Sequence, residues 1–76
     1  MKEIKIKLTN IADIREFVNE VILLDYDVDL VQGRYVIDAK SIMGIFSLDH
    51  LSPITVSAHS DSANAFFERI SRFVCE

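Results

Sequence analysis

The sequence predicts an α+β protein, an open-faced β-sandwich in which a four-stranded antiparallel sheet carries three helices on one face. Two observations predict this fold and its order, β-α-β-β-α-β-α. Apolar residues recur every second residue in four short segments, and every third or fourth residue in the segments between them. Each strand segment has one apolar and one polar side, which is typical of an antiparallel sheet that is covered on a single face. The 76 residues are expected to form one domain, residues 1–76.

The first strand and the first helix are separated by a change of period at Asn10. Residues 2–8 alternate, with the lysines on one side and the apolar residues on the other: Ile4, Ile6 and Leu8. Asn10 is a preferred N-cap residue, and Asp13 follows three residues later in the first turn. The helix that starts there is indicated by apolar residues at helical spacing: Ile11, Ile14, Phe17, Val18, Val21 and Ile22.

Two strands joined by a hairpin are predicted next. In residues 25–30 three aspartates alternate with the apolar residues Tyr26, Val28 and Leu30. The dipeptide Gln32–Gly33 indicates a tight turn. Residues 34–39 are expected to form the partner strand, with an inner face made of Tyr35, Ile37 and Ala39.

A short helix, a fourth strand and a last helix complete the predicted fold. Ser41 is expected to cap the short helix, whose apolar residues lie nearly all round it: Ile42, Met43, Ile45, Phe46 and Leu48. Because so short a helix cannot bury all of them, at least Met43 or Phe46 should be exposed. The fourth strand should turn inward Ile54, Val56 and Ala58. The last helix should begin near Ser60 or Asp61, with an apolar stripe of Ala63, Phe66, Phe67, Ile70, Phe73 and Val74.

Composition and charge argue against several classes of function. The net charge is −4, and no broad basic face is evident, so nucleic acid is not an expected partner. No apolar stretch has the length needed to span a bilayer, so membrane insertion is not expected. The single cysteine, Cys75, cannot form an internal disulfide, and a cytoplasmic location is expected.

The segment "KSIMG" at residues 40–44 resembles the serine segment of HPr, the histidine-containing phosphocarrier protein of the sugar phosphotransferase system. The resemblance extends to "FV" at residues 17–18, to "ITVSA" at residues 54–58 and to the β-α-β-β-α-β-α order. In that family a histidine at the start of the first helix carries the phosphoryl group, with an arginine nearby. A serine in the "KSIMG" position can be phosphorylated by a dedicated kinase that controls sugar use.

The resemblance implies that the phosphocarrier site is degenerate in this chain. Counting back from Phe17 or from Ser41 puts Asn10 at the position of the family's histidine. Ala12 then stands at the position of the arginine, and Asp13 at that of a proline. An asparagine cannot form a phosphoramidate that turns over, and an aspartate repels an incoming phosphoryl group. The sequence therefore predicts an HPr-like variant without phosphocarrier activity.

Other groups of polar residues in the sequence are weaker candidates for a functional site. His50 and His59 are expected to be solvated surface histidines, which makes phosphoryl transfer through either a weak alternative. The run Asp25, Asp27, Asp29 resembles the start of a calcium loop, but the required glycine and glutamate are missing at residues 30 and 36. No cysteine and histidine set has zinc spacing, and no glycine-rich phosphate loop is present. We therefore expect neither an enzyme, nor a metal site, nor a cofactor.

Two hypotheses for function remain open, and both depend on Ser41. In the first, the protein is a regulatory protein-binding module controlled through phosphorylation of Ser41, and Ile42, Met43 and Phe46 contact the partner. The resemblance implies protein partners such as a serine kinase and a transcriptional regulator of sugar use. In the second, Ser41 is only a helix cap, and the chain is an interaction or assembly module that keeps the fold alone.

Overall fold

A computed structural model describes residues 2–75. The predicted order is confirmed, and the elements have these bounds: β1 (Lys2–Ile6), α1 (Ile11–Ile22), β2 (Val28–Gln32), β3 (Tyr35–Asp38), α2 (Ile42–Phe46), β4 (Ile54–Ala58), α3 (Asn64–Arg69) and a 3₁₀ turn η1 (Ser71–Phe73). All strand pairs are antiparallel, and the strands lie in the order β1-β4-β2-β3. Patterning alone had left this strand order open, because it depends on which strands pair across the sheet.

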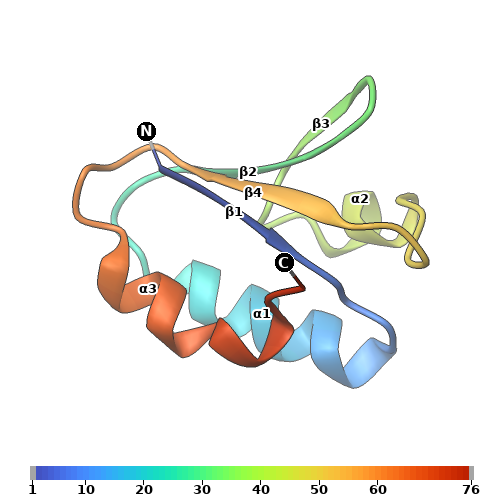
Figure 1. Cartoon of the computed structure of the whole chain (residues 1–76), viewed down its shortest axis with the longest axis horizontal. Helices are drawn as coiled ribbons and strands as arrows, with labels where there is room; N and C mark the ends of the chain where they lie inside the picture. Colours follow the sequence, from blue (N-terminus) through green and yellow to red (C-terminus); the bar gives the residue numbers. More distant parts are fainter. Residues whose placement is uncertain (1, 76) are drawn as a thin grey trace.

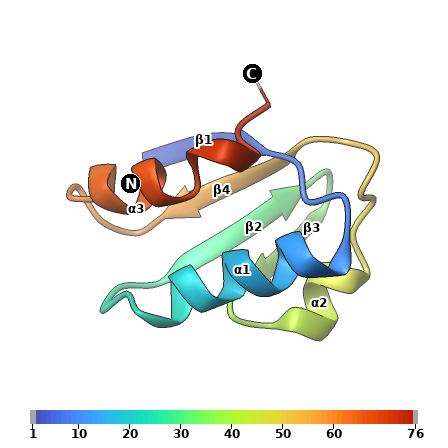
Figure 2. The same ribbon diagram turned by 90° about the horizontal axis from the view of Figure 1, so that it is seen from below.

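The helices cover one face of the sheet, as predicted, and one core lies between the two layers. Figure 1 shows α1 and α3 below the sheet, and Figure 2 shows α2 beside the first turns of α1. Phe17 of α1 and Phe66 of α3 meet in this layer, with ring centroids 6.2 Å apart. Four residues from the predicted apolar faces are fully or almost fully buried: Ile6, Phe17, Phe66 and Ile70. Ile11 and Ile22, the first and last residues of α1, are instead exposed.

The hairpin between β2 and β3 turns at Gly33 and Arg34, one residue later than the dipeptide signal suggested. Gln32 is paired with Tyr35, so the loop contains two residues. Gly33 has a φ of 58°, and no other described residue has a positive φ. A positive φ at the first loop position only is the signature of a type II′ turn, which takes glycine there.

The two edge strands of the sheet differ in whether another segment pairs with their outer side. At the β1 edge the chain end runs alongside the strand, since Val74 forms an antiparallel bridge with Ile6. The amide of Lys7 donates to the carbonyl of Phe73 at 2.9 Å, and the amide of Cys75 donates to the carbonyl of Lys5 at 3.2 Å. Among the described residues, β3 is paired only with β2, so the opposite edge is open.

Two predictions for the central strands were wrong in detail. The alternation that begins at Asp25 predicted a strand from there, but β2 begins at Val28. Tyr26 lies before the strand and is partly buried against the core, and this burial raises the pKa of its phenol. Tyr35, expected on the inner face, is 65% exposed, because it sits at the end of the edge strand beyond the helices.

The last helix begins later and ends earlier than its apolar stripe suggested. The expected start was Ser60 or Asp61, but α3 begins at Asn64, after a turn in which the Ser60 hydroxyl accepts from the amide of Ser62 at 3.0 Å. The helix ends at Arg69, and the 3₁₀ turn η1 continues the chain. The stripe still packs inward, with Ala63, Phe66, Ile70 and Phe73 buried, because a 3₁₀ turn keeps nearly the same side of the chain toward the core.

Candidate functional site

The candidate site lies where the start of α1 meets α2. The Asn10 side chain caps α1 as predicted, because its Oδ1 accepts from the amide of Asp13 at 2.8 Å. The hydroxyl of Thr9 donates in turn to the Asp13 carboxylate at 3.4 Å. Asn10 and Ala12 are exposed, whereas Asp13 is partly buried. The first turn of α1 therefore holds a carboxylate of its own at the positive end of the helix dipole.

A hollow of about 230 Å³ opens at this helix start. It is lined by residues of three segments: Thr9, Asn10, Ile11, Ile14, Phe46 and His50. His50 was expected to be a solvated surface histidine, and that prediction was wrong. Its ring is partly buried, and Nδ1 lies 3.0 Å from the carbonyl oxygen of Leu8. No lysine or arginine belongs to this lining, so an anion in the hollow would find no side-chain cation.

Sequence reasoning missed His50 because its contact with Leu8 spans 42 residues. No local pattern distinguishes a histidine that folds back on the first helix from one that faces solvent. Only the return of the 47–53 loop to the start of α1, which follows from the sheet topology, brings the two together.

Ser41 caps α2 as predicted. Its hydroxyl oxygen accepts from the amide of Gly44 at 3.2 Å, and its carbonyl accepts from the amide of Ile45 at 3.0 Å. The side chain of Ser41 is exposed. A Cβ at position 44 would lie 3.1 Å from the Ser41 hydroxyl and 3.3 Å from the Cδ1 atom of Ile37, so the glycine permits a close approach of cap, helix and strand.

The three segments that line the hollow carry exposed apolar side chains, and we call this set the helix-end patch: Ile11, Met43, Phe46 and Leu51. Met43 is 74% exposed and Phe46 is 42% exposed, so the prediction that at least one of them is exposed is confirmed. They lie three residues apart on α2, and Phe46 shares the hollow with Ile11. Ile42, named with them as a contact residue, is partly buried against the core instead.

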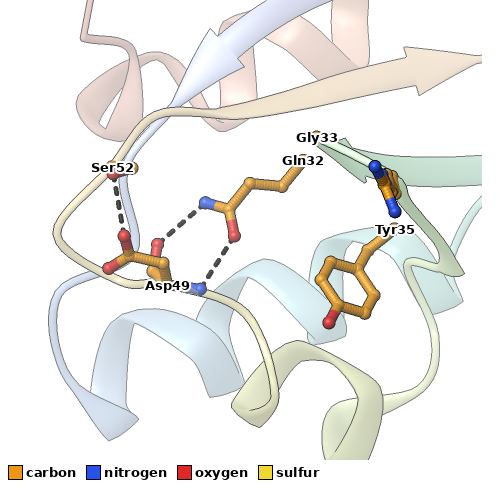
Figure 3. Close-up of a pocket in the computed structure, with 6 residues that line it drawn as sticks. Gln32, Gly33, Tyr35, Asp49 and Ser52 are labelled. Carbon is orange, nitrogen blue, oxygen red and sulfur yellow. Dashed lines mark hydrogen bonds between the residues drawn. The ribbon is translucent and has the colours of Figure 1, made fainter.

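A second hollow, of about 400 Å³, separates the β2–β3 hairpin from the 47–53 loop (Figure 3). The amide group of Gln32 holds the loop, because its Nε2 donates to the carbonyl of Asp49 and its Oε1 accepts from the amide of Asp49, both at 2.8 Å. The Asp49 carboxylate then accepts from the amide of Leu51 at 3.0 Å and from the hydroxyl of Ser52 at 2.9 Å. These hydrogen bonds hold the pKa of Asp49 below its usual range.

The remaining polar candidates lie away from the helix-end patch. His59 is exposed and pairs with Asp29, with Nε2 2.8 Å from Oδ2. Asp25 and Asp27 precede β2, and Asp29 lies opposite Asp38 in the sheet. Within residues 2–75, no group of three or more histidine, cysteine or acidic side chains is arranged to hold a metal ion. In the same part of the chain, no helix is long and apolar enough to cross a membrane.

Comparison with known proteins finds similarity in solved structures. The sequence matches no family model and no curated protein. The structure superposes on HPr-C-His from Thermoanaerobacter tengcongensis with a TM-score of 0.78 at 22% identity, covering 97% of this chain and 91% of that one. For the phosphocarrier protein HPr from Bacillus anthracis the TM-score is 0.73 at 26% identity, with 97% and 94% covered.

A third solved structure is that of Crh, the catabolite repression protein of Bacillus subtilis. Its TM-score is 0.66 at 25% identity, covering 96% of this chain and 90% of that one, and it is described as an intertwined dimer with a swapped domain. The three proteins share the four-stranded open sheet and the three helices of this chain.

Proposed function

We propose that this chain, which is an HPr-like protein, is a regulatory protein-binding module that has no phosphocarrier activity and is controlled through Ser41. The observation that carries the proposal is the exposed helix-end patch beside an exposed serine that caps a helix. An apolar surface of this kind on a small soluble fold is typical of a protein-binding site. Met43 and Phe46 are the proposed contact residues, and Ile42, which is partly buried against the core, is proposed to contribute less.

The start of α1 supports the absence of phosphocarrier activity. Asn10 has no ring nitrogen to accept a phosphoryl group, and its Oδ1 is engaged by the amide of Asp13. The Asp13 carboxylate occupies the positive end of the helix, where an incoming phosphoryl group would need stabilisation. His50 does lie in the hollow, so it is the one imidazole there that could accept a phosphoryl group, but the lining supplies no cation to stabilise it.

Ser41 has the surroundings that a regulatory phosphate needs. The first amides of a helix lack partners within the helix, and a phosphate on the cap residue lies next to them. Lys40 adds a positive charge beside the serine, while the Asp38 carboxylate accepts from the backbone amide of Lys40 at 2.9 Å. A phosphate adds nearly two negative charges at pH 7, which would change the charge of the surface next to Met43 without requiring the core to move.

The test of carrier activity is incubation with phosphoenolpyruvate and the general enzyme of the phosphotransferase system. We expect no acid-labile phosphate on the purified protein. A His50→Gln variant is run in parallel. A phosphohistidine that appears on the wild type and disappears in His50→Gln would contradict the proposal and identify His50 as a replacement acceptor.

The test of regulation is incubation with a serine kinase of this system and ATP, followed by mass spectrometry of the phosphorylated residue. Ser41→Asn is the matched control, because asparagine caps a helix as well as serine does but has no hydroxyl to phosphorylate. We expect phosphate on the wild type at Ser41 and none on Ser41→Asn. If the wild type stays unmodified, the result favours the alternative function, an interaction or assembly module in which Ser41 is only a helix cap.

Apolar docking is tested separately from phosphorylation. Met43→Lys should weaken binding of a partner whether or not Ser41 carries phosphate, because the apolar contact does not depend on that charge. Leu23→Lys is the control, since Leu23 is 76% exposed at the other end of α1. Equal effects of the two substitutions on partner affinity would show that the helix-end patch is not part of the binding site.

A further inference from the structure

We propose that the open edge of the sheet, strand β3, pairs antiparallel with β3 of a second copy of this chain. The two edges differ in a way that points to β3. At the other edge, the 73–75 segment pairs with residues 5–7 at the end of β1, and Lys2 and Lys5 lie within the strand. On β3, Tyr35 is 65% exposed and Val36 is 63% exposed, and no lysine, proline or bulge blocks the strand. Such an edge is a ready template for another strand.

The hydrogen-bond pattern within the hairpin decides which residues of β3 face outward. Gln32 and Tyr35 close a two-residue loop and are a hydrogen-bonded pair, and pairing alternates from there along the strands. The amide of Ala39 donates to the carbonyl of Val28 at 2.9 Å, which continues the same alternation. The amide and carbonyl of Val36, the carbonyl of Arg34 and the amide of Asp38 therefore point to the open edge. The carbonyl of Asp38 already accepts from the amide of Ser41 at 2.9 Å.

This alternation restricts the register of a symmetric pair. Only registers that place outward-facing residues opposite one another can form the ladder. With Val36 opposite its own counterpart, Arg34 lies opposite Asp38 of the second copy, and the same contact occurs twice by symmetry. Shifting the pair by two residues toward the chain end would oppose Arg34 with Lys40, which are like charges, and Val36 with Asp38.

The side chains agree with this register. Arg34, Val36 and Asp38 lie on the face of the sheet that the helices leave open, because residues along a strand alternate between faces. The amide of Lys40 engages Oδ1 of Asp38, so Oδ2 can accept from an arginine. On the helix side, the exposed ring of Tyr35 would lie over Ile37 of the second copy. The pairing would thus cover the apolar side chains that the monomer exposes at this edge.

The first test is sedimentation equilibrium of the full chain over a range of concentrations up to about 1 mM, where weak complexes are populated. We expect the mean mass to rise from that of a monomer toward that of a dimer. Val36→Pro should raise the dissociation constant about tenfold or more, because it removes both symmetric N–H donors but no bond to β2. Val36→Thr keeps the donor and should resemble the wild type. Arg34→Glu should also weaken the dimer, whereas Arg15→Glu, on α1, should not.

The second test reads the register by cross-linking in a Cys75→Ser background. Residues opposite each other in a hydrogen-bonded pair have Cα atoms about 5.5 Å apart, within the range for a disulfide. Val36→Cys should therefore form a covalent dimer on oxidation. Val31→Cys, on β2 of the same face, should stay monomeric because two β3 strands would separate the copies.

Three results would overturn the proposal. One is a monomeric mass at every concentration. Another is a dimer that Val36→Pro leaves intact while its circular dichroism matches that of the wild type, since such a dimer would use another surface. The third is a folded Val36→Cys variant that does not cross-link where Val31→Cys does. None of these outcomes bears on phosphorylation of Ser41 or on binding through the helix-end patch, whose residues lie on α1, on α2 and in the 47–53 loop.

Discussion

At the scale of single residues, the site depends on side chains that satisfy backbone groups. Asn10 and Ser41 were identified from the sequence because caps have strong residue preferences. Gln32 and Asp49 were not, because their bonds join segments 17 residues apart, and glutamine has no such preference. These two residues fix the loop that carries His50 to the candidate site.

Asp49 gives a prediction for pH dependence. Hydrogen bonds from Leu51 and Ser52 hold the pKa of this carboxyl below its ordinary value of about 3.9. Because the pKa of Asp49 is lower in the folded than in the unfolded state, its ionised carboxylate stabilises the fold above about pH 3.9. This stabilisation is lost as the pH falls through the pKa of the folded state. We expect an NMR titration to find the pKa of Asp49 below its ordinary range and to move it upward in Ser52→Ala. A pKa at or above that range would show that the turn does not depend on the charge.

At the scale of elements, each helix is positioned by a cap or by an aromatic anchor. The first helix starts after a side-chain cap, whereas α3 begins at Asn64 after Ala63, which has no side chain that can cap it. The stability of α3 must therefore come from packing, and Phe66, which is 1% exposed, is its main contact with the core. Ion pairs from Arg69 to Glu20 and from Arg72 to Glu16 add contacts between the C-terminal elements and α1 at the surface.

The cap of α1 can be tested by urea denaturation. Asn10→Ala should cost about 1 kcal/mol of the free energy of unfolding, since the amide of Asp13 loses its acceptor. Asn10→Ser should lose much less, because serine caps equally well. If the two variants are equally stable, Asn10 does not act through its side chain.

The anchor of α3 gives a larger expected effect. Phe66→Ala should cost roughly 3–5 kcal/mol, as for other large aromatics removed from a core. Phe67→Ala is the matched control and should cost less, because Phe67 is only partly buried. A loss below about 1 kcal/mol for Phe66→Ala would place that side chain at the surface, against its burial in the structure.

At the scale of the whole molecule, one core joins seven of the eight elements, and β3 reaches it through the partly buried Ile37. Residues from β1, α1, β2, α2, β4, α3 and η1 belong to the same buried cluster, so no element has a core of its own. We expect a single cooperative unfolding transition, with coincident curves from far-ultraviolet circular dichroism and from tyrosine absorbance. The free energy of unfolding should fall by about 1 kcal/mol for each molar increase in urea, as for small domains. Separate transitions for the two probes would show that part of the fold melts independently.

The sequence by itself determined the type and order of the elements, both side-chain caps and most of the core. The reason is that hydrophobic period and cap preference are local, so they survive in a single sequence. It placed the starts of β2 and α3 too early, and it wrongly placed Tyr35 on the inner face of the sheet. Both errors arise because an apolar pattern can continue past the residue at which strand pairing or packing stops.

Only the tertiary structure decided the strand order, the position of His50 beside Asn10 and the difference between the two sheet edges. The same is true of the hydrogen bonds by which Gln32 holds the backbone of Asp49. Each of these depends on contacts between segments that are distant along the chain. No period or motif encodes such contacts, because they follow from how the strands pair and how the loops between them return to the helices.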